Sequence, residues 1–117
     1  MIAIVLSAIV ALLHLYFLVL EMFRWEEPRT RAAFGTSEEF ARASRVLAAN
    51  QGLYNGFLAV GILLSLYGGE AMRPALIFAL TCVCVAGLYG ARTASPKILY
   101  IQALPGAIAL AAVLYRV

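Results

Sequence analysis

The fold is decided by residues 46–67, VLAANQGLYNGFLAVGILLSLY, which contain no Asp, Glu, Lys or Arg. At about 1.5 Å per residue, a helix over these 22 residues is long enough to cross a hydrocarbon core of roughly 30 Å. A helix of a soluble bundle would instead carry a polar face at a 3.6-residue period. We therefore expect this segment to span a membrane.

Three further uncharged stretches flank it, and the composition of the whole chain agrees with them. Apolar residues make up 64% of the chain and charged residues 13%, against about a quarter charged in ordinary soluble domains. The sequence predicts an all-α membrane protein, a four-transmembrane-helix antiparallel bundle in one domain over residues 1–117. The expected helices cover about residues 1–23, 37–67, 73–91 and 97–116.

The basic residues predict the orientation. Seven lie in the connections after the first and third spans and two on the opposite side: Arg24, Arg29, Arg31, Arg42, Arg45, Arg92 and Lys97 against Arg73 and Arg116. By the positive-inside rule, we expect a multi-pass protein of the inner (plasma) membrane with both termini outside. We interpret the net charge of +3 as a topology signal, with no nucleic acid as partner. The first span lacks a basic n-region and is interpreted as a retained helix.

The long connection, residues 24–45, is expected to be a cytoplasmic loop whose second half is helical. Pro28 and Gly35 are interpreted as breakers. Thr36 and Glu39 have capping-box spacing, and Glu38 lies four residues before Arg42. One long helix is therefore predicted from about Ser37.

The second span carries an unusual polar motif at residues 50–56, NQGLYNG. On a helix, Asn50 and Tyr54 share one face and Gln51 and Asn55 share another. The Gly52-x-x-x-Gly56 pair permits close approach of a second backbone. The amides either hold helices together or line a polar cleft that opens to the cytoplasm.

Two ionisable residues mark the first span. Glu21 either forms an ion pair with Arg24 at the interface or acts as an intramembrane functional group. His14, seven residues earlier, either bonds a neighbouring helix or relays protons to Glu21.

Cationic and phenolic groups gather near the predicted cytoplasmic ends of the spans and suit an anionic ligand such as a lipid headgroup. They also match ordinary interfacial anchors. The ligand-binding candidates are Arg24, Asn50, Tyr54, Asn55, Tyr89, Arg92 and Lys97, and the intramembrane polar candidates are His14, Glu21, Gln51 and Gln102. Pro105 is expected to kink the fourth span.

The chemistry-bearing residues are few. Cys82 and Cys84 point to opposite sides of a helix, so they can neither bridge nor chelate together. We expect no metal site and no classical hydrolase, and no catalytic residue is assigned.

The strings LEMFRW at 20–25, FG at 34–35 and AANQGLYNGF at 48–57 closely resemble domain-of-unknown-function family 1304, a bacterial family of small membrane proteins. This resemblance covers essentially the whole chain and implies no activity.

The layout more distantly resembles the membrane-associated eicosanoid and glutathione metabolism proteins, the MAPEG family. The resemblance implies a MAPEG-like fold, a homotrimer, and a cleft for glutathione or another low-molecular-weight thiol at Arg24, Asn50 and Tyr89. Basic residues and a Glu of that family's second-helix motif are replaced by Val46, Ala49 and Leu53 or Tyr54. Cys82 stands where an Arg is expected, and Lys97 is the nearest substitute for another.

Three hypotheses follow for the function. The first is a membrane protein whose cytoplasmic-side cleft binds an amphipathic or lipid-like ligand, with membrane lipids as partners. The second is a glutathione-dependent transferase or isomerase acting on lipophilic substrates. The third is a small transporter or membrane scaffold.

Overall fold

The computed structural model describes residues 1–117 and contains helices but no strand, which confirms the all-α class. η1 is a 3-10 helix and η2 a π-helix. The elements are α1 (Ile2–Phe23), α2 (Pro28–Phe34), α3 (Glu38–Tyr67), η1 (Gly69–Met72), α4 (Arg73–Thr93), η2 (Leu99–Ala103) and α5 (Leu104–Leu114).

Three helical segments are long and apolar enough to cross a membrane, namely Ile2–Phe23, Glu38–Tyr67 and Gly69–Thr93. The apolar helix Leu99–Leu114 is shorter. Large apolar side chains such as Leu12, Phe57 and Phe78 are exposed along these helices. Such surfaces suit a hydrocarbon surrounding, because helices that are apolar all round are otherwise found only in buried cores.

The chain divides into two compact units, and α1 and α3 each run through both. We call Met1–Leu13 with Leu58–Val117 the hairpin unit, because it contains α4 and α5. We call His14–Phe57 the clamp unit, after the hydrogen bonds described below.

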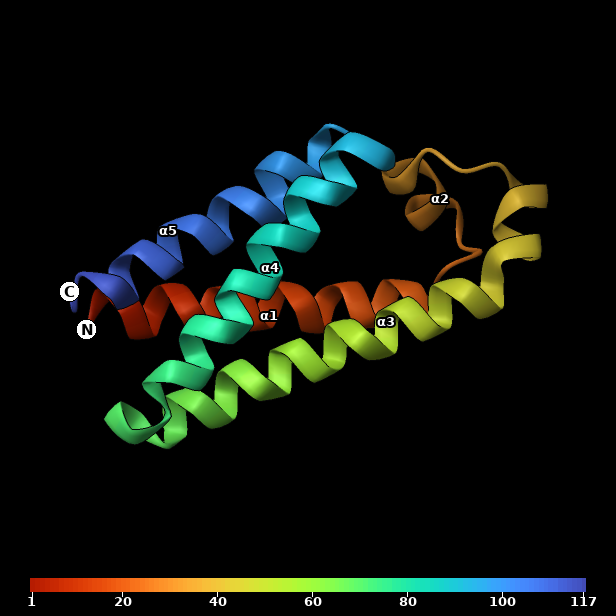
Figure 1. The fold of residues 1–117 in the computed structure, drawn as a ribbon. Helices are drawn as coiled ribbons and strands as arrows, with labels where there is room; N and C mark the ends of the chain where they lie inside the picture. The colour runs from red at the N-terminus through yellow and green to blue at the C-terminus, as the bar shows by residue number, and fades with distance from the viewer. The chain divides into compact units, whose positions relative to one another are not determined.

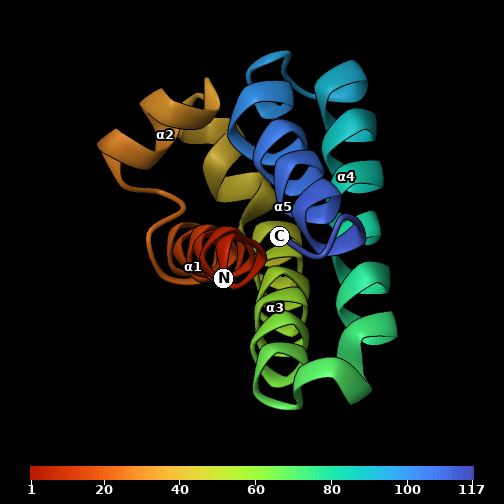
Figure 2. The ribbon, with the colours of Figure 1, turned by 90° about the vertical axis from the view of Figure 1, so that its left-hand side faces the viewer.

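In the hairpin unit, α4 and η2–α5 lie side by side next to their connection and diverge toward their other ends (Figures 1 and 2). Two glycines permit this close approach. A Cβ on Gly87 would lie 2.8 Å from the backbone N and Cα of Ala103, and one on Gly106 would lie 2.8 Å from Cγ1 of Val83. A larger residue at either glycine position would push the two helices apart.

The fourth apolar segment is distorted where Pro105 was expected to kink it. Pro105 has no N–H, so it cannot donate to the carbonyl four residues earlier. The structure places the π-helix η2 directly before this residue, and the N–H of Leu104 donates to Leu99 O, five residues back. A widened turn therefore absorbs the missing donor.

In the clamp unit, the first half of the long connection contains a helix that the sequence analysis missed. Pro28 occupies the first turn of α2, where its fixed φ is favourable, and Gly35 ends the helix with φ 67°. Pro28 and Gly35, which we interpreted as breakers, are the start and stop signals of α2. Thr30 is buried, and the Trp25 ring lies edge-on against Phe34 at 4.9 Å.

α3 begins close to the predicted position, but its cap is Ser37 rather than Thr36. Ser37 Oγ accepts a hydrogen bond from the backbone N–H of Phe40 at 3.1 Å. The predicted pair of Glu38 and Arg42 is confirmed, with Arg42 Nη2 lying 3.2 Å from Glu38 Oε1. The helix then continues without a break to Tyr67.

Candidate functional site

The clamp unit contains a buried carboxyl group. Glu21 of α1 is only 3% exposed. Asn55 Nδ2 of α3 donates to both of its oxygens, at 3.3 Å to Oε1 and 3.2 Å to Oε2, and Gln51 Nε2 donates to Oε1 at 3.4 Å. We call these three side chains the carboxyl clamp. Gln51 and Asn55 are one helical turn apart, so both amides reach the same carboxyl group.

The glycine pair of the motif brings α1 against α3 beside this clamp. A Cβ on Gly52 would lie 3.0 Å from Glu21 Cβ and 3.3 Å from the backbone O of Leu18. A Cβ on Gly56 would meet Leu18 Cδ1 at 2.6 Å. The expected close approach at Gly52-x-x-x-Gly56 thus occurs within this chain, and its partner helix is α1.

The expected ion pair between Glu21 and Arg24 is not formed. Arg24 Nη1 instead lies 3.4 Å from Glu27 Oε2, and both of these side chains are exposed. Arg24 lies just after the last residue of α1, where the chain turns out of the helix. Glu21 instead faces α3, where the amides of Gln51 and Asn55 donate to its carboxyl group.

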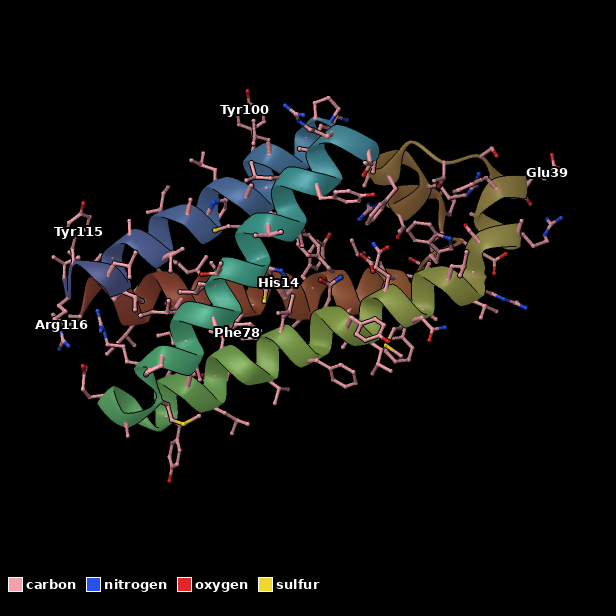
Figure 3. All side chains as sticks on the ribbon, viewed as in Figure 1. His14, Glu39, Phe78, Tyr100, Tyr115 and Arg116 are labelled. Atoms are coloured by element: carbon pink, nitrogen blue, oxygen red, sulfur yellow. The ribbon has the colours of Figure 1, made fainter.

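His14 is 1% exposed, and its ring meets Phe17 edge-on at 5.6 Å between centroids. Figure 3 shows it in the middle of α1. The relay from His14 to Glu21 stays a hypothesis. The carboxyl group of Glu21 itself accepts hydrogen bonds from two amides.

Asn50 and Tyr54 lie on an exposed face of α3. Asn50 Nδ2 donates to Val46 O of its own helix at 2.9 Å. Tyr54 is 66% exposed and stacks edge-on with Phe57. Within this chain, then, Asn50 joins no second helix, and of the motif's three amides only Gln51 and Asn55 link helices.

In the hairpin unit, a groove lies at the end of α4 and the start of η2. It has a volume of about 640 Å³, and its lining combines apolar side chains with two phenols and one guanidinium: Leu88, Tyr89, Ala91, Arg92, Pro96, Leu99 and Tyr100. Tyr100 projects away from the helices (Figure 3), and Tyr89 is similarly exposed. We call this the Arg92 groove.

The guanidinium of this groove has no partner in the chain. Most basic side chains of the protein do have one: Arg24, Arg42, Arg45 and Arg116 pair with carboxylates, and Arg31 and Arg73 donate to backbone carbonyls. Arg92, Lys97 and Arg29 make no such contact. Two of these three unpaired cations thus lie at or beside the connection between α4 and η2.

Gln102 lies on the same π-helix as two residues of the groove wall. Its Nε2 donates to the backbone O of Val83 at 3.3 Å, which ties η2 to α4. Leu99 and Tyr100, at the other end of the same π-helix, line the groove. Gln102 is therefore a positioning residue and does not line the groove itself.

Six of the seven predicted ligand-binding candidates, all except Asn55, are divided between the two units. Arg24, Asn50 and Tyr54 belong to the clamp unit, and Tyr89, Arg92 and Lys97 to the hairpin unit. Of these six, the structure brings Tyr89 and Arg92 together in the Arg92 groove, and Lys97 lies on the adjoining connection.

The sequence indicated the members of the carboxyl clamp but not their pairing. Glu21, Gln51 and Asn55 were each named as candidates, but nothing in the chain's order pairs Glu21 with residues thirty or more positions later. The usable signal was the i,i+4 spacing of the two amides, which identifies one helix face with two donors.

Cys82 and Cys84 are both free and half-buried, and they lie two residues apart on α4. No group of three or more His, Cys, Asp or Glu side chains is arranged to hold a metal ion.

Comparison with known proteins confirms the family that the sequence motifs, among them residues 48–57, indicated. Residues 8–114 match the family described as "Protein of unknown function (DUF1304)". The chain is also similar to "Uncharacterized protein YpaA" of Lactococcus lactis subsp. lactis (strain IL1403). The two are 33% identical over 101 residues, which covers 85% of each chain. No solved structure matches. Because the family match extends over nearly the whole length, this chain belongs to the DUF1304 family.

Proposed function

We propose that this protein is a four-span membrane protein that binds an anionic amphiphile in the Arg92 groove, at the cytoplasmic side of the bilayer. In this proposal, Leu99–Leu114 crosses the bilayer together with the three longer helices. Seven basic residues lie in the connections after the first and third spans, and they support the orientation with both termini outside.

The single observation that carries the proposal is the unpaired guanidinium in a partly apolar groove. An Arg fork binds phosphate or carboxylate oxygens in bidentate fashion. Tyr89 and Tyr100 supply phenolic donors beside it, and Leu88 and Leu99 supply apolar surface for a hydrocarbon chain. A groove of this composition and volume suits a ligand with one anionic end and one apolar end.

The experiment measures lipid binding to purified protein by native mass spectrometry, with phosphatidylglycerol as the probe and phosphatidylcholine as the reference lipid. Arg92→Gln should lower the affinity for phosphatidylglycerol by about tenfold, because a charge-assisted hydrogen bond is lost. The matched control is Arg29→Gln, which removes an equally unpaired charge that does not line the groove and belongs to the clamp unit. Equal losses in both variants would show diffuse electrostatics and refute the proposal.

The glutathione-dependent, MAPEG-like alternative makes a different prediction for the same sample. Glutathione should then bind with measurable heat, and Arg24→Gln should weaken that binding. No contact favours this alternative specifically, since Arg24 is paired with Glu27. We therefore place the amphiphile first.

Self-association remains part of the proposal. The exposed face of α3 that carries Asn50 and Tyr54 supports it, because a carboxamide can both donate to and accept from its counterpart in a second copy. The homotrimer implied by the MAPEG resemblance is one assembly that would cover this face.

A further inference from the structure

A second cavity lies in the hairpin unit, at the end of α4 opposite the Arg92 groove. It has a volume of about 330 Å³. Its walls come from the first turn of α1, the end of α3, η1 with the start of α4, and the end of α5. The cavity shares no lining residue with the Arg92 groove, so it is a separate candidate site.

Two opposite charges meet among the residues that line this cavity. Arg116 Nη1 lies 2.8 Å from Glu70 Oε1, and these side chains are 64% and 67% exposed. Figure 3 shows Arg116 projecting from the end of the chain, next to Tyr115. An ion pair this exposed contributes little stability, because solvent screens both charges. A ligand that offers a replacement for each charge can therefore take its place at small cost.

A third charge, Arg73, is held by the backbone rather than by a carboxylate. Its Nη2 donates to Val113 O at 3.1 Å and to Leu114 O at 3.4 Å, which caps the last turn of α5 where α4 and α5 diverge. These bonds use one nitrogen of a group that has five N–H donors. Arg73 thus keeps both its charge and donors for a ligand.

The charge balance and the walls together define the ligand. Two guanidinium groups, of Arg73 and Arg116, and one carboxylate, of Glu70, line the cavity. The remaining wall is largely apolar, formed by Ile4, Leu66 and Leu76. The site therefore offers two cations for an acid group, one carboxylate for an ammonium, and an apolar side.

We propose that this cavity binds a compact zwitterion in which a primary ammonium group is joined to a phosphate. The phosphate contacts Arg73 and Arg116, and the ammonium replaces Arg116 as the partner of Glu70. A phosphatidylethanolamine headgroup and free phosphoethanolamine share this chemistry.

The test uses the full chain in phosphatidylcholine nanodiscs and follows its thermal unfolding. Two probes are added separately, phosphatidylethanolamine in the disc and phosphoethanolamine in solution. We expect one or both to raise the melting temperature of the wild type. Phosphatidylglycerol and inorganic phosphate should have a weaker effect, because neither carries an ammonium group.

Glu70→Gln should abolish the preference for the ammonium-bearing probe, with a loss in affinity of about tenfold. Glu27→Gln is the matched control, since Glu27 also pairs with an exposed Arg but lies in the clamp unit. A response to the lipid alone identifies the headgroup as the source, and a response to phosphoethanolamine identifies the free zwitterion. The proposal is overturned if neither probe stabilises the wild type, or if the two variants behave alike. Arg92→Gln should leave these responses unchanged, which separates this site from the Arg92 groove.

Discussion

The hairpin unit and the clamp unit both bring helices close together through glycine, but they fix the contact in different ways. In the hairpin, Gly87 and Gly106 let α4 and η2–α5 meet at backbone distance, and the amide of Gln102 adds a bond to a backbone carbonyl. In the clamp, Gly52 and Gly56 admit α1, and a buried carboxyl group accepts bonds from two amides. The first contact depends on shape, and the second on directional polar bonds.

This difference matters in a membrane, where no hydrophobic effect drives helices together. A contact that depends on shape, as in the hairpin unit, has no room for an added atom. It places few requirements on which polar groups pair. At Gly56 the clamp tolerates some change of shape, because the contacts there involve the end of the flexible Leu18 side chain. The two units should therefore respond differently to steric and to polar substitutions.

The largest effect is expected from Gly87→Leu. The new side chain would enter the backbone of Ala103, so α4 and η2 would have to separate. We expect a loss of about 3 kcal/mol or more in the free energy of unfolding, at the upper end for overpacking. Denaturant titration in detergent, followed by circular dichroism, measures it. Gly61→Leu on α3 is the control, since nothing lies within 4 Å of a Cβ there, and a similar loss in that variant would contradict the steric account.

Glu21→Ala should have the next largest effect, because it leaves the amides of Gln51 and Asn55 without their acceptor. The expected cost is about 1 to 3 kcal/mol for buried donors left unpaired. A double-mutant cycle with Asn55→Ala should show a coupling energy of roughly 0.6 to 1.7 kcal/mol, the range for polar contacts between membrane helices. Additive losses would mean that the clamp contributes nothing as a pair.

A smaller effect is expected from Gln102→Leu, which removes one bond to Val83 O while keeping the size of the side chain. Stability should fall by about 1 kcal/mol. Because η2 also carries Leu99 and Tyr100, affinity for phosphatidylglycerol in the Arg92 groove should fall as well. A lower melting temperature with unaltered lipid affinity would rule out the positioning role and leave only packing.

The smallest effect on the single chain is expected from Asn50→Leu. The Asn50 side chain bonds only to Val46 O of its own helix, so its removal strands no partner in the chain. The free energy of unfolding of diluted protein in detergent should change by less than about 0.5 kcal/mol. A clear drop that grows with protein concentration would instead place its partner in a second copy.

Much of the helical layout could be predicted, because runs without charge leave few alternatives. The end of α3 at Tyr67 and the start of α4 at Arg73 lie at the predicted positions. α2 could have been predicted as well, since Pro28 and Gly35 are start and stop signals when they stand seven residues apart. We interpreted each by itself as a breaker and so missed the helix between them.

The partners of the polar residues could not be predicted in the same way. Glu21 has Arg24 nearby in the sequence but binds Gln51 and Asn55 on another helix. The depth and rotation of α1 against α3 decide this, and both are set by how Gly52 and Gly56 receive Leu18 and Met22. Asn50 belongs to the same motif, yet it lies on a neighbouring, exposed face of α3 and bonds only its own helix. A sequence motif names the residues on a helix but does not say which face receives a neighbour.

The π-helix at Leu99–Ala103 has a consequence for how this protein can change over evolution. Its hydrogen bond spans five residues where an α-helix spans four, so it holds one residue more than the regular turn would. Loss of a single codon in this segment could restore an ordinary helix, whereas the same loss inside α4 would rotate every following side chain by about 100°. We expect relatives to differ in length by one residue here, with the small residues that meet Gly87 kept in register on one side and the groove-lining residues free to diverge on the other.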